Sequence, residues 1–407
     1  MKKKNSGRVK VNSMSTRSST ENPLQASSGK SARLFFLDHL RAALVILVVL
    51  HHVALVYGAG APFYYAEPPL TDPAAYRTLL VFILFNQAWF MGAFFLLAGC
   101  FTPASYDRKG PGGFIKGRLL RLGVPLIFFY FVLHPLASIG YWQMPAELTG
   151  ITAPLTWGAY PRLLGMGPMW FAAMLLVFDL GYAVWRMLTA KRKTANPANA
   201  SPPGYLAIGV FVLALALASY LMRTAVPMGE YVIGFPTLSY LPQYIALFAV
   251  GAAAARRDMF RTLPGSAGIA GFTAAAAASI LLFPLAFSGR MFSLQIADPA
   301  PFVGNGHWQS AVYALWDSIL AVGLCLGALT LFRRFFNRPG RFGKFLSQHS
   351  YAVYIIHVPA VVFIAVAMKG IQLEPLMKFG LVSIIAMPVC FAVAFVVRKI
   401  PGAARVI

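Results

Sequence analysis

The stretch FLDHLRAALVILVVLHHVALVY, residues 36–57, is the first of a series of long apolar runs that decide how this chain folds. A helix of about 20 apolar residues is long enough to cross the hydrocarbon core of a bilayer. Arg41 and His52 lie inside this run, although ionisable groups are costly in a membrane and are usually kept for chemistry or transport. The stretch therefore predicts both a membrane helix and a candidate site.

The composition of the whole chain indicates the same class. Of 407 residues, 58% are hydrophobic and 12% are charged, and the mean hydropathy of +0.66 is that of a membrane protein. The formal net charge is +23, but the basic residues are spread in short clusters rather than gathered in one polar domain. The three cysteines have no metal-ligand or disulfide spacing. We predict an all-α, polytopic membrane protein that contacts lipids and binds neither nucleic acid nor metal.

Apolar runs of spanning length recur along the chain. We predict about ten transmembrane helices, near residues 36–57, 78–101, 119–139, 168–188, 205–223, 237–255, 267–287, 308–332, 347–368 and 377–398. Pro242 and Pro359 interrupt the sixth and the ninth of these segments. Residues 33–400 form one transmembrane domain in this prediction, and residues 401–407 form a cytoplasmic tail.

The loops alternate between rich and poor in Lys and Arg. Because basic residues concentrate in cytoplasmic loops, this alternation places both chain termini in the cytoplasm. Arg223 and Lys378 then belong to the poor, outside set of loops. Residues 1–32 are basic, rich in Ser and Thr and almost free of large apolar residues, so we predict a disordered cytoplasmic tail rather than a cleaved signal peptide.

The first segment carries residues that can act together. Asp38 and Arg41 are three residues apart, which allows an ion pair on one helix face. His52 follows Arg41 by eleven residues, so it returns to within about 20° of the same line and lies about 16 Å further along the axis. His51 points about 100° away from His52. The structural alternative is a snorkelling Arg and a His bonded between helices, and the shared line favours a functional role.

A basic segment precedes the third predicted helix. It reads KGRLLRLGVP over residues 116–125 and contains Lys116, Arg118 and Arg121. Arg118 and Arg121 are three residues apart, so we expect them to face one way. Ordinary positive-inside anchoring explains this pair, and phosphate binding by their planar guanidinium groups is the functional alternative.

Polar residues also occur inside later segments. Ser350, Tyr354 and His357 follow a spacing of four and then three, which places them on one helix face, where they bond to other helices or serve catalysis. Five further polar residues have no partner that the sequence assigns: Asp179, Asp317, His134, Asn86 and Gln87.

These motifs resemble the membrane acyltransferase 3 family. The resemblance rests on Leu37-Asp38-His39-Leu40-Arg41 with His52, on Phe94-Phe95 with Gly99, on Arg118-Leu119-Leu120-Arg121 with Pro125, and on Ser350-Tyr351 with Tyr354 and His357. It covers residues 33–137 and 340–360 best, and it is closest to the branch that succinylates periplasmic glucans. The chain differs in having Ala98 and Ala42 where the family often has Ser and Gly.

The resemblance implies an integral membrane O-acyltransferase of the bacterial inner membrane. The donor would be cytoplasmic acetyl- or succinyl-CoA, used as a co-substrate without a tightly bound cofactor, and the acceptor would be a hydroxyl of an extracytoplasmic glycan. His52 would act as general base or acyl relay, with Arg41, held by Asp38, stabilising negative charge. Tyr354 and His357 would line the site or orient the acceptor. The CoA phosphates would be bound by Lys116, Arg118 and Arg121.

A second class of function fits several of these observations. A transporter or flippase for an anionic lipid or glycan also places Arg and His inside a helix bundle. However, the sequence has no pair of Pro- or Gly-broken helices in matching halves, which many such transporters have. Release of free CoA thiol distinguishes the two classes, because a transporter consumes no thioester.

Overall fold

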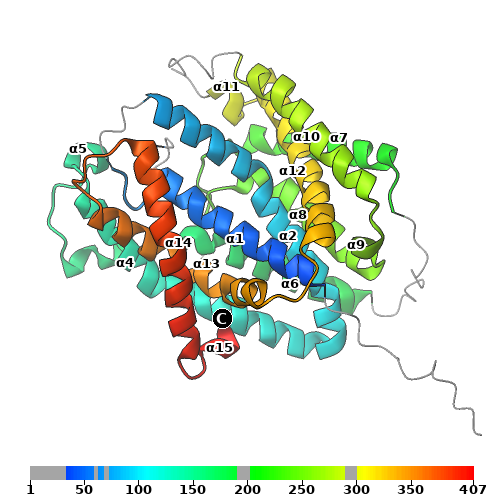
Figure 1. The fold of residues 1–407 in the computed structure, drawn as a ribbon, viewed down its shortest axis with the longest axis horizontal. Helices are drawn as coiled ribbons and strands as arrows, with labels where there is room; N and C mark the ends of the chain where they lie inside the picture. Colours follow the sequence, from blue (N-terminus) through cyan, green and yellow to red (C-terminus); the bar gives the residue numbers. More distant parts are fainter. Residues whose placement is uncertain (1–33, 59–62, 68–72, 190–201, 289–299) are drawn as a thin grey trace, which may run out of the picture. The chain divides into compact units, whose positions relative to one another are not determined.

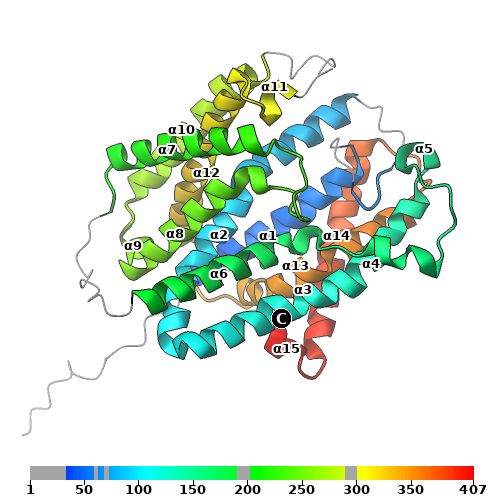
Figure 2. The same cartoon turned by 180° about the vertical axis from the view of Figure 1, so that it is seen from behind.

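The computed structural model describes residues 34–58, 63–67, 73–189, 202–288 and 300–407. Within these ranges every regular element is a helix and no β-strand occurs, as Figures 1 and 2 show from two sides. The prediction of an all-α, polytopic membrane protein is confirmed. The tail predicted at residues 1–32 lies outside the described residues.

Nine helical runs in these ranges are long and apolar enough to cross a membrane. They are Phe35–Val56, Ala74–Gln143, Trp157–Leu188, Tyr205–Ala225, Leu238–Arg256, Gly265–Ala286, Trp308–Phe335, Arg341–Ala367 and Pro375–Lys399. The sequence predicts ten spans, and the difference arises in Ala74–Gln143, which has 70 residues and contains the spans predicted at 78–101 and 119–139.

The Ala74–Gln143 run turns back on itself at Gly110. This residue lies inside α2, Pro73–Arg118, but has φ 68° and ψ 171°, a conformation essentially restricted to glycine, and Pro111 follows it. Arg118 Nη2 donates to Thr102 Oγ1 at 3.2 Å, although 16 residues separate them and a straight helix would set them about 24 Å apart. The run therefore contains two antiparallel passes, which brings the nine described runs to ten crossings.

The returning pass is a chain of short helical pieces. Two π-helical turns, Leu119–Gly123 and Phe129–Leu133, alternate with α3, Val124–Phe128, and α4, His134–Ser138. A 3₁₀ turn, Ile139–Gln143, ends the pass. Because a π turn bonds i to i+5, it shifts the angular phase of the residues that follow it.

Two prolines in this pass create hydrogen-bond acceptors for other segments. Pro125 and Pro135 have no N–H to bond the carbonyl four residues earlier. Tyr351 donates its hydroxyl to the carbonyl freed by Pro125, that of Arg121, at 2.5 Å. Tyr160 donates to the carbonyl freed by Pro135 at 2.6 Å. Backbone groups that would be unsatisfied in an apolar layer thus find partners outside their own helix.

Helix α1, Phe35–Val56, lies inside the bundle and contacts α2, α12, α13 and α14 (Figure 1). The longer helices after α2 are α6 Trp170–Leu188, α7 Tyr205–Ala225, α8 Leu241–Arg256, α10 Gly265–Ala286, α12 Trp308–Phe335, α13 Arg341–Ala367 and α14 Pro375–Lys399. The shorter ones are α5 Ala146–Thr149, α9 Met259–Thr262, α11 Ala300–Val303 and α15 Ala403–Val406. Pro242 stands in the first turn of α8, and α13 continues through Pro359.

Gly99 allows α2 and α8 to approach each other closely. A Cβ atom on Gly99 would collide with the backbone of Phe248, and one on Gly251 would collide with the backbone of Leu96. Small residues at such crossings are how helices pack in membranes, where no hydrophobic force drives them together. Packing of these two helices therefore accounts for Gly99 in the Phe94-Phe95-Leu96-Leu97-Ala98-Gly99 motif.

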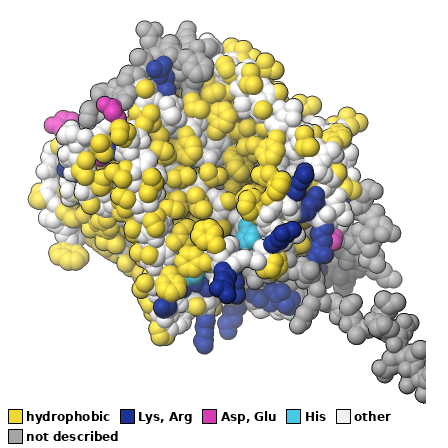
Figure 3. Space-filling model, viewed as in Figure 1, with side chains coloured by type: hydrophobic (Ala, Val, Ile, Leu, Met, Phe, Trp, Pro, Cys, Tyr) yellow, Lys and Arg dark blue, Asp and Glu magenta, His cyan; other side chains and the backbone are white. Residues whose placement is uncertain are grey.

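One end of the bundle carries a group of exposed basic side chains. Here α1 and α13 begin and the Ala74–Gln143 run reverses. The exposed residues include Arg108, Lys109, Lys116, Arg121, Arg341 and Lys344. Figure 3 shows Lys and Arg gathered on the lower part of one face, below a broad apolar area. We call this part of the molecule the basic end; that it faces the cytoplasm stays a prediction.

Candidate active site

Helices α1 and α13 bring two histidines together inside the bundle. His52 Nδ1 lies 3.2 Å from His357 Nε2, and the two ring centroids are 4.8 Å apart. His357 is fully buried, whereas His52 keeps part of its surface accessible. The sequence singles out both residues from separate patterns, but it does not predict that they touch.

The backbone decides which ring nitrogens carry hydrogen. His357 Nδ1 lies 2.7 Å from the carbonyl of Tyr354, and His52 Nδ1 lies 2.8 Å from the carbonyl of Val48. A carbonyl only accepts hydrogen bonds, so in neutral rings both Nδ1 atoms are protonated. His357 Nε2 then accepts from the N–H of His52, and His52 Nε2 keeps its lone pair. That nitrogen has the chemistry of a general base.

Aromatic side chains surround the histidine pair. The Phe63 ring lies 5.2 Å from the His52 ring, centroid to centroid. The Tyr354 ring stacks at 6.1 Å from the His357 ring, and its hydroxyl donates to the carbonyl of Pro168 at 2.5 Å. Tyr354 therefore links the pair to the segment just before α6, and Phe63 links it to the segment that follows α1.

Two residues close in sequence to the pair face elsewhere. His51 stacks on Phe90 of α2 with ring centroids 5.1 Å apart, which agrees with the angle predicted between the two adjacent histidines. Ser350 is fully buried and donates to the carbonyl of Leu346 in its own helix at 2.7 Å. Of the three residues aligned on α13, only Tyr354 and His357 reach the site.

Arg41 and His52 face the same helix, as their shared line predicts. Arg41 Nη2 donates to Asp38 Oδ1 at 3.1 Å and to the carbonyl of Ser347 in α13 at 3.3 Å. Three helical turns, about 16 Å, still separate Arg41 from His52. Arg41 therefore lies toward the basic end, where it does not reach atoms that react at His52.

Arg118 and Arg121 do not face one way, in contrast to the prediction. Arg118 points inward and forms an ion pair with Asp179 at 3.0 Å between Nε and Oδ2, while Thr102 donates to the other carboxylate oxygen at 2.8 Å. Arg121 is exposed. The π turn that begins after Arg118 changes the number of residues per turn, so a step of three no longer returns to the same face.

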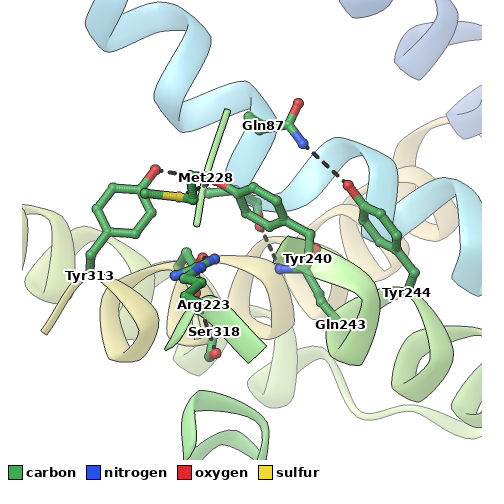
Figure 4. A network of polar contacts seen from close by, with 10 residues as sticks. Gln87, Arg223, Met228, Tyr240, Gln243, Tyr244, Tyr313 and Ser318 are labelled. Atoms are coloured by element: carbon green, nitrogen blue, oxygen red, sulfur yellow. Dashed lines mark hydrogen bonds and ion pairs between the residues drawn. The ribbon is translucent and has the colours of Figure 1, made fainter. Parts of the chain in front are cut away.

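A second buried pair joins α7 to α12. Arg223 is fully buried and pairs with Asp317, which is also buried. Its guanidinium lies over the ring of Tyr240 at 4.7 Å and over that of Tyr313 at 5.3 Å. Figure 4 shows Met228 between the rings of these two tyrosines and Arg223 just below them. Arg223 lies in the last turn of α7, where opposite charge and aromatic faces hold it inside the bundle; that it lies toward the outer side of the membrane stays a prediction.

Lys378 is also buried rather than exposed in a loop. It pairs with Glu67, which comes from the segment 63–67 after α1. The sequence did not indicate this pair or the pair of Arg118 with Asp179. Counts of basic residues in loops report the side of the membrane and not the depth of a side chain, and partners that lie far apart in sequence leave no local pattern.

The predictions for phosphate and for metal ligands can be compared with the side chains of the described residues. The exposed Lys116 and Arg121 at the basic end are suited to phosphate oxygens. In the described part of the chain, no group of three or more His, Cys, Asp or Glu side chains is arranged to hold a metal ion.

Comparison with known proteins assigns this arrangement to an enzyme family. The family model described as an acyltransferase domain matches residues 34–395. No curated protein and no solved structure matches the chain. The match covers nearly the whole helical bundle, including both histidines, and it identifies the protein as an acyltransferase. The chain belongs to the acyltransferase 3 family.

Proposed function

We propose that this membrane acyltransferase moves an acyl group from cytoplasmic acyl-CoA to a hydroxyl of an extracytoplasmic glycan, in a bacterial inner membrane. The observation that carries the proposal is the contact of His52 Nδ1 with the carbonyl of Val48 and with His357 Nε2, from which we infer a free lone pair on His52 Nε2. A partly accessible base inside the bundle is what an acceptor hydroxyl needs. The resemblance to the glucan-succinylating branch supports a glucan acceptor and succinyl-CoA.

The reaction assigns one step to each histidine. His52 Nε2 takes the proton of the acceptor hydroxyl while the hydroxyl oxygen attacks the thioester carbonyl, so that a C–O bond forms and the C–S bond breaks. The CoA sulfur leaves as thiolate and receives that proton from His52. His357 Nε2 accepts the N–H of His52 throughout, which holds the ring in place and stabilises its positive charge.

The donor enters from the basic end in this proposal. Lys116 and Arg121 are exposed there and bind CoA phosphates. Arg118 belongs to the same segment, but its guanidinium is paired with Asp179. Arg118 therefore mainly positions the segment that carries Arg121. Arg41, held by Asp38, contacts the donor between the phosphates and the thioester.

The test follows both products of the reaction. Membranes with the protein are incubated with labelled acyl-CoA and a gluco-oligosaccharide, and free CoA thiol and the mass of the oligosaccharide are measured. We expect thiol and acylated sugar in equal amounts, with the added mass naming the acyl group. The variant His52→Gln abolishes both, and His349→Gln is the matched control because the His349 ring packs on Phe345 and Phe395.

Two results would overturn the proposal. Full acyl transfer by His52→Gln at equal protein level would remove His52 from the chemistry. Movement of an anionic lipid or glycan across the membrane without release of thiol would instead support the transporter alternative, for which the buried Arg223–Asp317 pair is the favouring observation.

A further inference from the structure

Next to the histidine pair, at the end of the bundle opposite to the basic end, lies a second aromatic cluster. Tyr64 follows Phe63, and the two rings are 5.0 Å apart. The Tyr64 ring meets the ring of His134 edge-on at 5.1 Å and lies 5.9 Å from the ring of Tyr141. Since Phe63 also contacts His52 at 5.2 Å, the cluster is joined to the site through one phenyl ring.

The elements that form this cluster come from distant parts of the chain. Tyr64 belongs to the segment 63–67, His134 begins α4, and Tyr141 lies in the 3₁₀ turn after it. Gly165 and Gly167 complete the cluster, because a Cβ atom on Gly165 would collide with the His134 ring and one on Gly167 with the Tyr64 hydroxyl. These glycines let the chain before α6 pass directly over the two rings.

The polar atoms of the cluster offer both kinds of hydrogen bond. His134 Nδ1 lies 2.5 Å from the carbonyl of Leu163, so this nitrogen carries hydrogen and Nε2 is an acceptor. Burial raises the pKa of Tyr64 well above its ordinary value, and the hydroxyls of Tyr141 and Tyr231 nearby raise it further. Tyr64 therefore stays protonated and remains a donor at any pH the cell reaches.

The chemistry of these groups selects one ligand class. The cluster combines aromatic faces, which pack on apolar C–H surfaces, with phenol and imidazole groups that bond hydroxyls. None of Tyr64, His134, Tyr141 and Tyr231 carries a fixed charge. A neutral, hydroxyl-rich ring matches this combination, and an anion does not.

We propose that Tyr64, His134 and Tyr141, with Tyr231 at the rim, bind a sugar unit of the acceptor and direct its hydroxyl past Phe63 to His52. This inference rests on the proposed function and adds to it the side of entry and the residues that select the acceptor. Tyr231 is 73% exposed, while Tyr64 is buried, so a sugar would first meet the rim and then the inner rings.

The experiment separates the acceptor from the donor. Full-length protein in membranes is assayed with acyl-CoA and a neutral gluco-oligosaccharide, and KM is measured for each substrate. Tyr64→Phe and His134→Phe each keep an aromatic ring but remove its hydrogen-bonding atoms, so we expect KM for the sugar to rise about three- to tenfold and KM for acyl-CoA to stay constant. Slow release of thiol to water, measured without sugar, also stays constant.

Two variants keep the test decisive. Tyr220→Phe is the matched control, because Tyr220 donates to the carbonyl of Gly306 in another part of the molecule, and it should change neither KM. Tyr231→Ala alters an exposed side chain that folding does not need, so it remains informative when an inner variant fails to fold, and we expect it to raise KM for the sugar as well.

The outcomes distinguish failure of this inference from failure of the proposed function. An unchanged KM for the sugar in Tyr64→Phe and Tyr231→Ala, in an enzyme that transfers acyl groups normally, overturns the acceptor site alone. Parallel changes in both KM values also overturn it, since they indicate a structural role. Absence of thiol release from the unaltered enzyme contradicts the proposed function itself.

Discussion

Two buried polar pairs lie in the same helix bundle, and they differ in how their atoms are satisfied. His52 and His357 are neutral partners that leave one ring nitrogen with a lone pair on a partly accessible side chain. Arg223 and Asp317 are opposite charges, both buried, and two tyrosine rings cover the guanidinium. The first pair keeps a ring nitrogen with a free lone pair, whereas the second is held by opposite charges and leaves Nε and Nη1 of Arg223 buried without a hydrogen-bond partner.

The difference shows how a membrane bundle separates chemistry from stability. A buried charge is tolerable when an opposite charge lies against it, and losing either partner leaves the other uncompensated. A neutral imidazole pair has a smaller desolvation cost, so it can hold an unused acceptor for a substrate. We therefore expect substitutions in the two pairs to give opposite results in assays of stability and of activity.

The largest effect is expected from breaking the charged pair. Asp317→Ala leaves Arg223 buried without its counter-charge, which should cost about 3–5 kcal/mol of stability. Thermal aggregation of the detergent-solubilised protein measures this loss. The double variant Arg223→Met with Asp317→Leu should recover much of it, because no charge then remains buried. If the single variant keeps its melting temperature and loses only acyl transfer, the pair is part of the reaction site and the comparison breaks down.

A smaller effect, on activity only, is expected from the histidine partner. His357→Ala removes the acceptor that orients His52 but leaves the base in place, so kcat should fall about 10- to 100-fold, less than in His52→Gln. His357→Gln, which retains an acceptor atom, should recover part of the loss. The control is Ser350→Ala in the same helix, since Ser350 bonds only its own backbone. Equal losses in the Ala and Gln variants would contradict an orienting role.

The smallest effect is expected at the basic end, where charges are exposed. Arg121→Ala should raise KM for acyl-CoA about two- to tenfold and leave KM for the sugar unchanged, because an exposed phosphate contact is screened by water and salt. The difference from the unaltered enzyme should shrink at high ionic strength. Arg162→Ala, an exposed basic position outside the basic end, is the matched control. A salt-independent change in kcat would place Arg121 in the chemistry and not in donor binding.

Much of the fold could be predicted from the sequence, because the hydrocarbon core of a membrane permits few backbone structures. The helices, the pair of Asp38 with Arg41 and the common direction of Arg41 and His52 all depend on spacing within one helix. The side-chain contacts that the sequence could not predict depend on residues from other helices. The partners of Asp179 and Asp317 lie 61 and 94 residues away, and no local spacing encodes them. The prediction that Arg118 and Arg121 share one helix face was also wrong, because a π turn follows Arg118.

The prolines of the returning pass have a consequence for how this bundle is assembled. A proline opens a carbonyl one turn before itself, and here a tyrosine on a different segment closes it. The position of the proline therefore determines where the tyrosine hydroxyl of another segment has to lie. In Pro125→Ala, the new backbone N–H could bond the carbonyl of Arg121, and the Tyr351 hydroxyl would lose its acceptor. Pro125 therefore connects the returning pass to α13 through Tyr351.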